Sequence, residues 1–468
     1  MKFTPNETMA DTHLNRFHIV LLLWCSFIMF FDGYDLIVYG AVLPPLMKQW
    51  SLNPNQAGWL GSAALIGMTF GAIFLGSLAD RIGRRPVIVY GTLLATLCAV
   101  GTGLATTPLA FGLLRLMIGI FLGGVVANIV SLMNELAPRA KRHTLTTIML
   151  SMYSVGAIIA TLVALWILPV LGWKPVFFIG GAALVFLPFL YHSMPESMTF
   201  LMSHGKESEA RSLLLRAAPT QNHNMVDWTL PAPHARPSVS VSRLFHEGRA
   251  LGTPMVWLAF SLCFFMVYGL STWLPKIMIG GGYDLGSSLQ FLVVLNIGGT
   301  VGALVGGWLG DRFGNRVVLV VFFALAVLAL ILLATHPGTA LLNVLLFVAG
   351  ATTIGTLAVI AGYGADYYPA EIRSTGLGWA FGLGHFGGFL GPVLGGSLLA
   401  LKLSLGQNFL IFAIPGVIAI VAVLLVSGTK TTRKGDNQHQ IREESVLADK
   451  KPMLLNANTH PEFSRRDE

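Results

Sequence analysis

Long apolar runs separated by short polar segments dominate the chain. A helix that crosses a bilayer needs about 20 mostly apolar residues, and the sequence holds twelve runs of that kind. The expected helices cover residues 19–43, 56–79, 87–106, 109–134, 144–169, 173–192, 252–277, 287–309, 316–335, 339–363, 371–401 and 405–428. The pattern therefore predicts an all-α membrane protein with twelve transmembrane helices.

Two longer polar segments divide this pattern. One is rich in proline and contains LPAPHARPS, and it separates the apolar runs into two sets of six. The other follows the last run, is strongly charged, and is expected to be disordered. The expected parts are a cytoplasmic N-terminal segment (1–18), a six-helix half (19–192), a cytoplasmic linker (193–250), a second six-helix half (251–428) and a cytoplasmic tail (429–468).

Composition and charge favour the same class of protein. Hydrophobic residues make up 54% of the chain and charged residues 11%, whereas a soluble domain carries about 25% charged residues. The net charge of +8 needs no nucleic-acid partner, because cytoplasmic loops of membrane proteins are enriched in Lys and Arg. With both termini cytoplasmic, only four basic residues fall in outer loops: Lys48, Lys174, Lys276 and Lys402.

Motifs of enzymes are missing from the sequence. It contains no H-x-x-x-H, H-E-x-x-H, C-x-x-C or G-x-S-x-G, and no G-x-x-x-x-G-K-[ST] loop for ATP. Cys25, Cys98 and Cys263 all lie in apolar runs, where small buried thiols are expected. We therefore expect no catalytic residues, no metal and no cofactor.

Each half contains the pattern G-x-x-x-D-R-x-G-x-R. It appears as GSLADRIGRRPVIV (76–89) after the second run and as GWLGDRFGNRVVLV (307–320) after the eighth. Repeats of this kind build many transporters, with the substrate site near the midplane between the repeats. We expect these residues to form a conformational latch at the inner surface, although a topology signal alone remains an alternative. They are Gly76, Asp80, Arg81, Gly83, Arg84, Arg85, Asp311, Arg312 and Arg316.

Further segments occur in a characteristic order. RLMIGIFLGG (115–124), PESMTFLMSHGKESEA (195–210) and PAEIRSTGLG (369–378), together with the two repeats, resemble motifs of the major facilitator superfamily. The resemblance covers nearly the whole chain. It implies two six-helix halves that transport a small solute by alternating access, in a protein that functions as a monomer.

The first apolar run carries a narrower resemblance. DGYDLIVYGAVLP (32–44) resembles the aromatic acid:proton symporters, and most closely the benzoate permeases among them. This implies import of an aromatic carboxylate with protons across a bacterial inner membrane. A hydroxybenzoate, gentisate or a phenylpropionate is an alternative cargo. Export is disfavoured because LSMYSVGAIIATLVALW lacks the glycine-proline signature of drug antiporters, and a sensor of the acid would need a larger output module.

Asp32 and Asp35 lie in the middle of the first expected helix. An aspartate there costs about 2.5–3.5 kcal/mol on insertion scales, so both are expected to serve a function. Three residues apart, they share one face of the helix, where repulsion and desolvation favour the protonated form of at least one. We predict that they carry protons. A structural hydrogen-bond network around Asp32 is the alternative, and Gly33 permits close backbone approach or local unwinding in either case.

Two further charged residues lie on the fourth expected helix. Arg115 cannot readily lose its charge and needs a carboxylate partner, which is the substrate, Asp32 or Asp35. The resemblance implies that this arginine couples proton and substrate binding, whereas a permanent ion pair between helices 1 and 4 is the alternative. Glu135, at the inner end of the helix, is expected to be a proton relay or an interfacial salt bridge.

His385 lies in the sequence GLGHFGG, where many relatives have arginine. It suits proton handling or contact with a carboxylate, and a structural role is the alternative. Aromatic rings that could flank the substrate ring are Tyr34, Tyr39, Tyr153, Tyr268, Trp273, Trp379, Phe386 and Phe389. The predicted substrate-binding set is Asp32, Tyr34, Arg115, Asn128, Tyr268, Asn296, Trp379, His385 and Phe386, with the two asparagines included because buried amides need partners.

Overall fold

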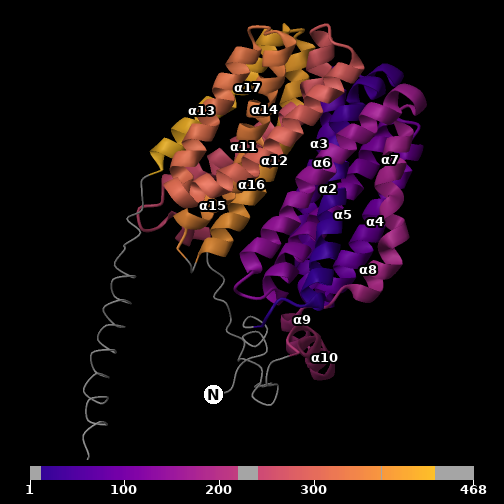
Figure 1. Cartoon of the computed structure of the whole chain (residues 1–468), viewed down its shortest axis with the longest axis vertical. Coiled ribbons are helices and arrows are strands. Elements are labelled where there is room, and N and C mark those ends of the chain that lie inside the picture. Colours follow the sequence, from indigo (N-terminus) through magenta and orange to yellow (C-terminus); the bar gives the residue numbers. More distant parts are fainter. Residues whose placement is uncertain (1–11, 220–240, 370–371, 427–468) are drawn as a thin grey trace, which may run out of the picture. The chain divides into compact units, whose positions relative to one another are not determined.

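The computed structural model describes residues 12–219, 241–369 and 372–426. All described residues belong to one compact unit, Met1–Val426. The second unit, Ser427–Glu468, lies outside the described residues and contains the whole of the expected tail. Regular structure in the described part is helical throughout (Figure 1).

The first half of the unit contains six spans. They are α2 (Arg16–Gln49), α3 (Pro54–Ile82), α4 (Arg84–Leu104), α5 (Pro108–Leu136), α6 (Arg142–Leu171) and a sixth made of α7 (Lys174–Gly180), η1 (Gly181–Phe186) and α8 (Leu187–Ser193). Three short helices follow: α9 (Met198–Ser203), α10 (Glu207–Ala217) and η3 (Val241–Phe245). The expected linker, 193–250, therefore contains helical segments.

The second half repeats this organisation. Its elements are α11 (Gly252–Gly280), α12 (Leu285–Phe313), α13 (Asn315–Leu333), α14 (Thr339–Thr353), α15 (Thr356–Tyr367), α16 (Arg373–Ala400) and α17 (Leu405–Leu425). Within the described residues, twelve spans are long and apolar enough to cross a membrane. The predicted fold class is confirmed, and the chain is a multi-pass membrane protein.

Two expected helices are divided in the structure. The sixth contains the 3-10 segment η1, and the tenth breaks between α14 and α15. The second break includes Gly355, whose added Cβ would lie 2.5 Å from the backbone of Gly302 in α12, so the absence of a side chain allows the close approach. By contrast, α16 continues through Pro392, and α2 continues through Pro44 and Pro45 to Gln49.

The repeated motif forms the same turn in both halves. Gly83 ends α3 with φ of +100°, and Gly314 ends α12 with φ of +86°. Glycine adopts positive φ without the steric cost that a Cβ would add. Arg84 and Arg316 lie beside these turns, and we call this end of the bundle the basic end. The opposite end, where Asn53 begins α3, is the far end.

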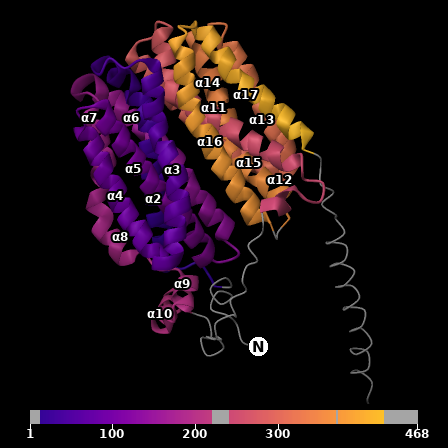
Figure 2. The same cartoon turned by 180° about the vertical axis from the view of Figure 1, so that it is seen from behind.

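The two halves pack against each other near the far end. The Oγ of Ser62 on α3 donates to the carbonyl of Phe389 on α16 at 2.6 Å. A Cβ added to Gly58 would lie 2.6 Å from the carbonyl oxygen of Pro392. We call this contact between α3 and α16 the far-end seam. Figures 1 and 2 show the halves side by side from both faces.

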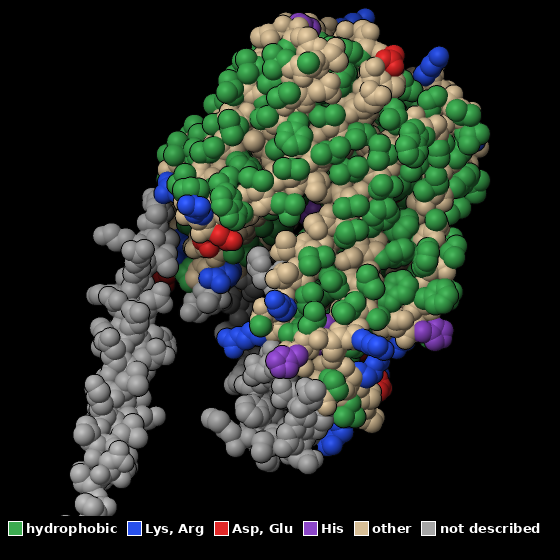
Figure 3. All heavy atoms as spheres, viewed as in Figure 1, with side chains coloured by type: hydrophobic (Ala, Val, Ile, Leu, Met, Phe, Trp, Pro, Cys, Tyr) green, Lys and Arg blue, Asp and Glu red, His purple; other side chains and the backbone are tan. Residues whose placement is uncertain are grey.

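Toward the basic end the same two helices lie apart. A Cβ added to Gly76 on α3, or to Gly378 or Gly382 on α16, would meet no atom within 4 Å. On the face shown in Figure 3, the surface is hollowed between the halves. The described structure is therefore closed along α3 and α16 at the far end and open along them at the basic end.

Candidate substrate and proton site

Asp35 and Arg115 form a buried ion pair between α2 and α5. The Nη1 of Arg115 donates to the Oδ2 of Asp35 at 2.6 Å and to its backbone carbonyl at 2.8 Å. Arg115 is 1% exposed, and its guanidinium lies 5.8 Å from the ring centroid of Tyr39. The positive charge is therefore compensated inside the first half.

Asp32 lies one turn earlier on α2 and has different surroundings. It is 2% exposed, and its Oδ1 has no hydrogen-bond partner. It interacts electrostatically with Tyr153 of α6 and Tyr268 of α11. The helix does not unwind here, because Gly33 lets α2 pack directly on the backbone of Tyr153.

Four buried polar atoms without partners mark the middle of the molecule. They belong to Asp32, Tyr153, Ser271 and His385, which come from α2, α6, α11 and α16. We call these four side chains, with Tyr268, the central cluster. Tyr153 and Tyr268 interact with each other, yet the Tyr153 hydroxyl makes no hydrogen bond of standard geometry. An unsatisfied buried polar group costs about 1–3 kcal/mol, so the arrangement is typical of a site that a ligand completes.

Aromatic side chains connect the parts of the central cluster that belong to the second half. The ring of Phe264 on α11 meets His385 edge-on at 5.2 Å between centroids. The same ring lies 6.0 Å from that of Tyr268. Glycines flank His385, and a Cβ on Gly388 would lie 3.0 Å from the Tyr268 ring. The cluster therefore offers apolar ring faces beside its polar atoms.

Several predicted binding residues make their contacts elsewhere. The Tyr34 hydroxyl donates to the carbonyl of Val176 at 2.7 Å. The amides of Asn128 and Asn296 each donate to a carbonyl one turn earlier on their own helix. Phe386 and Trp379 are 50% and 45% exposed. Among the predicted substrate residues, the described contacts join only Asp32, Tyr268 and His385 in the central cluster.

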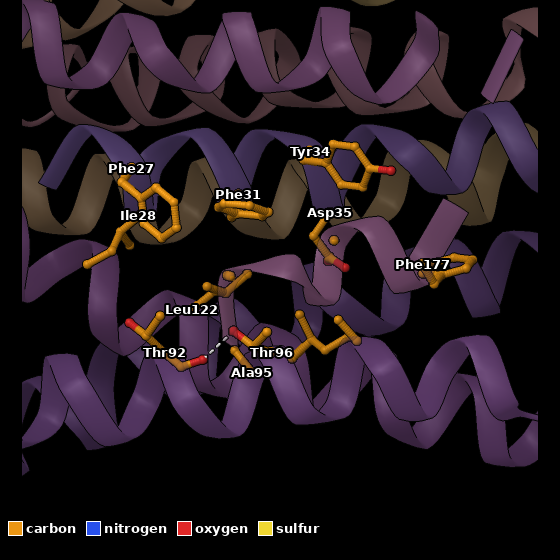
Figure 4. A pocket seen from close by; sticks show the side chains of 14 residues that line it. Phe27, Ile28, Phe31, Tyr34, Asp35, Thr92, Ala95, Thr96, Leu122 and Phe177 are labelled. Atoms are coloured by element: carbon orange, nitrogen blue, oxygen red, sulfur yellow. Dashed lines mark hydrogen bonds between the residues drawn. The ribbon is translucent and has the colours of Figure 1, made fainter. Parts of the chain in front are cut away.

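A small cavity lies beside Asp35 on the side of α4 (Figure 4). Its volume is about 30 Å³, which is room for one water molecule and far too little for an aromatic acid. Its lining is mostly apolar and comes from the first half; it includes Phe31, Tyr34, Asp35, Thr96 and Phe177. This cavity is therefore not a substrate site.

Glu135 belongs to a polar cluster at the basic end. It accepts hydrogen bonds from the Arg84 guanidinium, from Ser197 at 2.9 Å and from the backbone of Thr199 at 2.7 Å. Beside it, Glu196 accepts from the backbone N–H of Arg84 at 2.8 Å and so caps the start of α4. These bonds attach the beginning of the linker to the first half.

The remaining motif residues do not join the halves. Asp80, Arg81, Asp311 and Arg312 are exposed, and none is in an ion pair within the part of the chain that the structure describes. Arg85 donates to the Tyr191 carbonyl at 2.7 Å, and Arg316 donates to the Leu424 carbonyl at 3.0 Å. Each of these hydrogen bonds stays inside one half, as an open basic end requires.

Sequence reasoning missed Ser271 and treated Tyr153 only as a ring contact. Ser271 lies three residues after Tyr268, which places both on one face of α11. A polar side chain on the same helix face as Tyr268 was the signal in the sequence that could have identified Ser271. No group of three or more His, Cys, Asp or Glu side chains within residues 12–219, 241–369 and 372–426 could hold a metal ion.

Comparison with known proteins agrees with this architecture. A sequence model described as Major Facilitator Superfamily matches residues 25–339 and 288–458. The benzoate transport protein of Acinetobacter baylyi is 37% identical over 90% of this chain and 92% of its own length. The gentisate transporter of Corynebacterium glutamicum is 34% identical over 88% of this chain and 87% of its own.

A solved structure shows the same fold. The inward open conformation of the xylose transporter XylE from E. coli superposes with a TM-score of 0.70 at 19% sequence identity, covering 88% of this chain and 98% of that one. These relatives are transporters, and the fold is that of a transporter rather than of an enzyme. The chain therefore belongs to the Major Facilitator Superfamily, in the group that includes these aromatic acid transporters.

Proposed function

We propose that this chain imports an aromatic carboxylate, most readily benzoate, together with protons. The observation that carries the proposal is the central cluster, in which both halves place unpartnered buried polar atoms around aromatic rings. The benzoate and gentisate transporters among the relatives support a cargo of this class. Their cargoes share a carboxylate on an aromatic ring, which is what the cluster can accommodate.

The residues suggest how the acid is held. The Tyr153 hydroxyl and Ser271 Oγ can donate to the carboxylate, which satisfies atoms that otherwise lack partners. The apolar ring can pack against Phe264 and Tyr268, since aromatic pairs favour offset or edge-on contact. The His385 ring meets the Phe264 ring edge-on. It contributes either a further donor or an acceptor, depending on its tautomer.

Charge balance suggests how protons take part. Asp35 and Arg115 neutralise each other, whereas Asp32 has no cationic partner among the described residues. A bound carboxylate beside an ionised Asp32 would place two like charges in a buried site, which is strongly unfavourable. We infer that Asp32 binds a proton whenever the acid is bound, so that proton and acid move together.

The proposal includes an orientation. Basic loops favour the cytoplasmic side, so the basic end faces the cytoplasm of a bacterial inner membrane and both termini lie there. The motif residues at that end would then act as the latch when the halves close on each other. The described form, open at the basic end, would be the form that releases the acid, and one chain would suffice for transport.

Reconstituted protein provides the test. We expect proteoliposomes with a pH one unit lower outside to accumulate radiolabelled benzoate up to about tenfold per coupled proton. Protein-free liposomes measure passive entry of the neutral acid. Asp32→Asn at equal protein level should abolish the gradient-driven part, because an amide cannot carry the proton.

Asp284→Asn is the matched control. Asp284 caps α12 at an exposed position of the far end, so the same chemical change there should leave uptake intact. Saturable transport that ignores both the gradient and Asp32→Asn would contradict coupling and indicate facilitated diffusion. Protein-dependent transport of other aromatic acids, but not of benzoate, would change the cargo and leave the proposed mechanism in place.

A further inference from the structure

A second group of unpartnered buried atoms lies in the second half, away from the central cluster. It comprises the Nε of Arg249, the Nε1 of Trp257 and the hydroxyls of Tyr363 and Tyr368. Arg249 and Tyr363 are 5% exposed, and Tyr368 is 1% exposed. We call these four side chains the Arg249 cluster. They lie just before α11, in its first turns and at the end of α15, all at the basic end.

These side chains are close neighbours. Tyr368 interacts electrostatically with Arg249, and it lies close to Trp257 without forming a hydrogen bond of standard geometry. Tyr363 interacts with Tyr368 and with Arg316. The rings of Tyr367 and Tyr368 meet edge-on at 5.0 Å. The unpartnered atoms therefore belong to one locality rather than to scattered packing defects.

The cluster is rich in hydrogen-bond donors and holds no buried carboxylate among the described residues. Guanidinium and indole nitrogens only donate, and burial raises the pKa of Tyr368 to about 12, so its hydroxyl keeps its proton at neutral pH. The neighbouring Thr253 hydroxyl already donates to the Leu244 carbonyl at 2.6 Å. Glu247 binds Arg249 through Nη2 at 2.8 Å, and its side chain is 75% exposed. A ligand with several acceptor atoms, such as a carboxylate or phosphate, would satisfy the unpartnered Arg249 and Trp257 nitrogens.

An aromatic surface adjoins these donors. The indole of Trp257 stacks on that of Trp379, with 5.7 Å between centroids and 22° between planes. Phe245 meets Trp257 edge-on at 5.5 Å. Trp379 is 45% exposed, and its neighbour Gly378 faces open space. A flat apolar ring can therefore lie against Trp379 while an attached anionic group points toward the donors.

We propose that the Arg249 cluster, with Trp257 and Trp379 as its aromatic side, is a second binding site for the aromatic carboxylate at the basic end. This inference rests on the proposed function, because it takes the cargo class from there. The acid occupies this site after it leaves the central cluster. A lipid phosphate shares the acceptor chemistry of a carboxylate but lacks the aromatic ring, and the experiment separates the two sources.

Direct binding measures the number of sites. The full chain in phosphatidylcholine nanodiscs is titrated with radiolabelled benzoate at equilibrium. We expect the wild type to bind two molecules per chain. Tyr368→Phe, which removes one hydroxyl, should weaken only one site by about tenfold or more, as loss of a hydrogen bond to a charged group predicts. Tyr363→Phe is a second variant with the same expectation.

Tyr34→Phe is the matched control, because the Tyr34 hydroxyl lies in the first half and already donates to the Val176 carbonyl. Two sites in Tyr34→Phe and one strong site in Tyr368→Phe would support the proposal. One wild-type site that Tyr368→Phe leaves unchanged would overturn it, while the proposed function would stand. Absence of any benzoate binding to the wild type would overturn the proposed function and this inference with it.

A second experiment distinguishes a lipid phosphate from the aromatic carboxylate as the ligand of the cluster. Nanodiscs that contain phosphatidylglycerol are examined by native mass spectrometry with and without benzoate. If the wild type retains a phosphatidylglycerol molecule that Tyr368→Phe loses and that benzoate does not displace, the cluster is a lipid site and the proposal is wrong. If benzoate displaces the lipid, or no lipid is retained, the assignment to the acid is supported.

Discussion

Asp32 and Asp35 are separated by two residues on α2, yet one has a cationic partner and the other has none. Arg115 reaches Asp35 because its side chain extends from α5 toward α2. Asp32 faces α6 and α11, where tyrosines approach it without satisfying its Oδ1. At the scale of single residues, the Asp35 carboxylate therefore contributes to stability, and the Asp32 carboxylate is available for exchange of a proton.

Stability measurements should separate these roles. Asp35→Asn leaves the buried Arg115 charge unpaired and is expected to destabilise the protein by about 3–5 kcal/mol. Asp32→Asn removes an unpaired carboxylate and should leave the unfolding temperature unchanged or raised. Thermal unfolding of detergent-solubilised protein measures both. If the double variant Asp35→Asn, Arg115→Gln is no more stable than Asp35→Asn alone, the unpaired Arg115 charge is not the cause of the destabilisation.

Tyr153→Phe tests the polar side of the central cluster. Removing the hydroxyl deletes one proposed donor to the substrate carboxylate and keeps the packed ring. We expect the KM for benzoate to rise about tenfold, since a hydrogen bond to a charged group contributes about 1.5–3 kcal/mol. The Tyr34→Phe variant is the comparison, because the Tyr34 hydroxyl already donates to Val176. Equal effects of the two substitutions on KM would contradict the assignment of Tyr153.

The sequence predicted the chemistry of these residues better than their pairing. An aspartate or arginine in an apolar run is recognisable from its cost alone. Which carboxylate meets Arg115 depends on the rotation of α2 against α5, and a three-residue spacing permits either choice. Asn128 and Asn296 were expected to need a ligand, but a carbonyl one turn earlier on the same helix accepts from each amide.

At the scale of elements, glycine determines where helices touch. The added Cβ of Gly33 would collide with the Tyr153 backbone, and that of Gly156 would collide with the backbone of Phe30, so α2 and α6 pack backbone to backbone.

Helix ends are specified by caps such as Asn53, whose side chain accepts from the N–H of Gln56 at 2.9 Å. Run lengths predicted all twelve spans, but the breaks in the sixth and tenth depend on contacts with other helices.

Gly33→Ala should separate α2 from α6. The new methyl group cannot fit against the Tyr153 backbone, so we expect destabilisation of about 1–3 kcal/mol from overpacking. Gly382→Ala is the control, because its methyl group would meet no atom within 4 Å and alanine favours helix by up to about 1 kcal/mol. Chemical denaturation compares the two. Equal stability of the two variants would mean that α2 and α6 are not in close contact.

At the scale of the whole molecule, the far-end seam closes one side while the basic end stays open along the same helices. Alternating access requires the seam to separate when the far end opens. The sequence predicted two halves from the repeated motif, and the matching turns at Gly83 and Gly314 agree with that prediction. It could not predict which end is open, because the same side chains are compatible with both forms.

Locking the far-end seam should stop transport. Ser62→Cys with Phe389→Cys places thiols on facing parts of α3 and α16, in a background where Cys25, Cys98 and Cys263 are replaced by alanine. A short thiol cross-linker should abolish benzoate uptake by the double variant, and reductant should restore it when the cross-linker contains a disulfide. Each single variant treated alike is the control. Full uptake by the cross-linked protein would show that the seam need not open.

The Asp35–Arg115 pair also has a consequence for biosynthesis. Its members are 80 residues apart in the chain. At about 5–20 residues per second, translation delivers Arg115 about 4–16 s after Asp35. During that interval the first helix must enter the bilayer with both aspartates unpaired, at about 2.5–3.5 kcal/mol each, or remain at the translocon until α5 arrives. If the helix waits at the translocon, membrane integration of the first four helices is a cooperative event, and a nascent chain released before Arg115 has emerged is expected not to stay inserted.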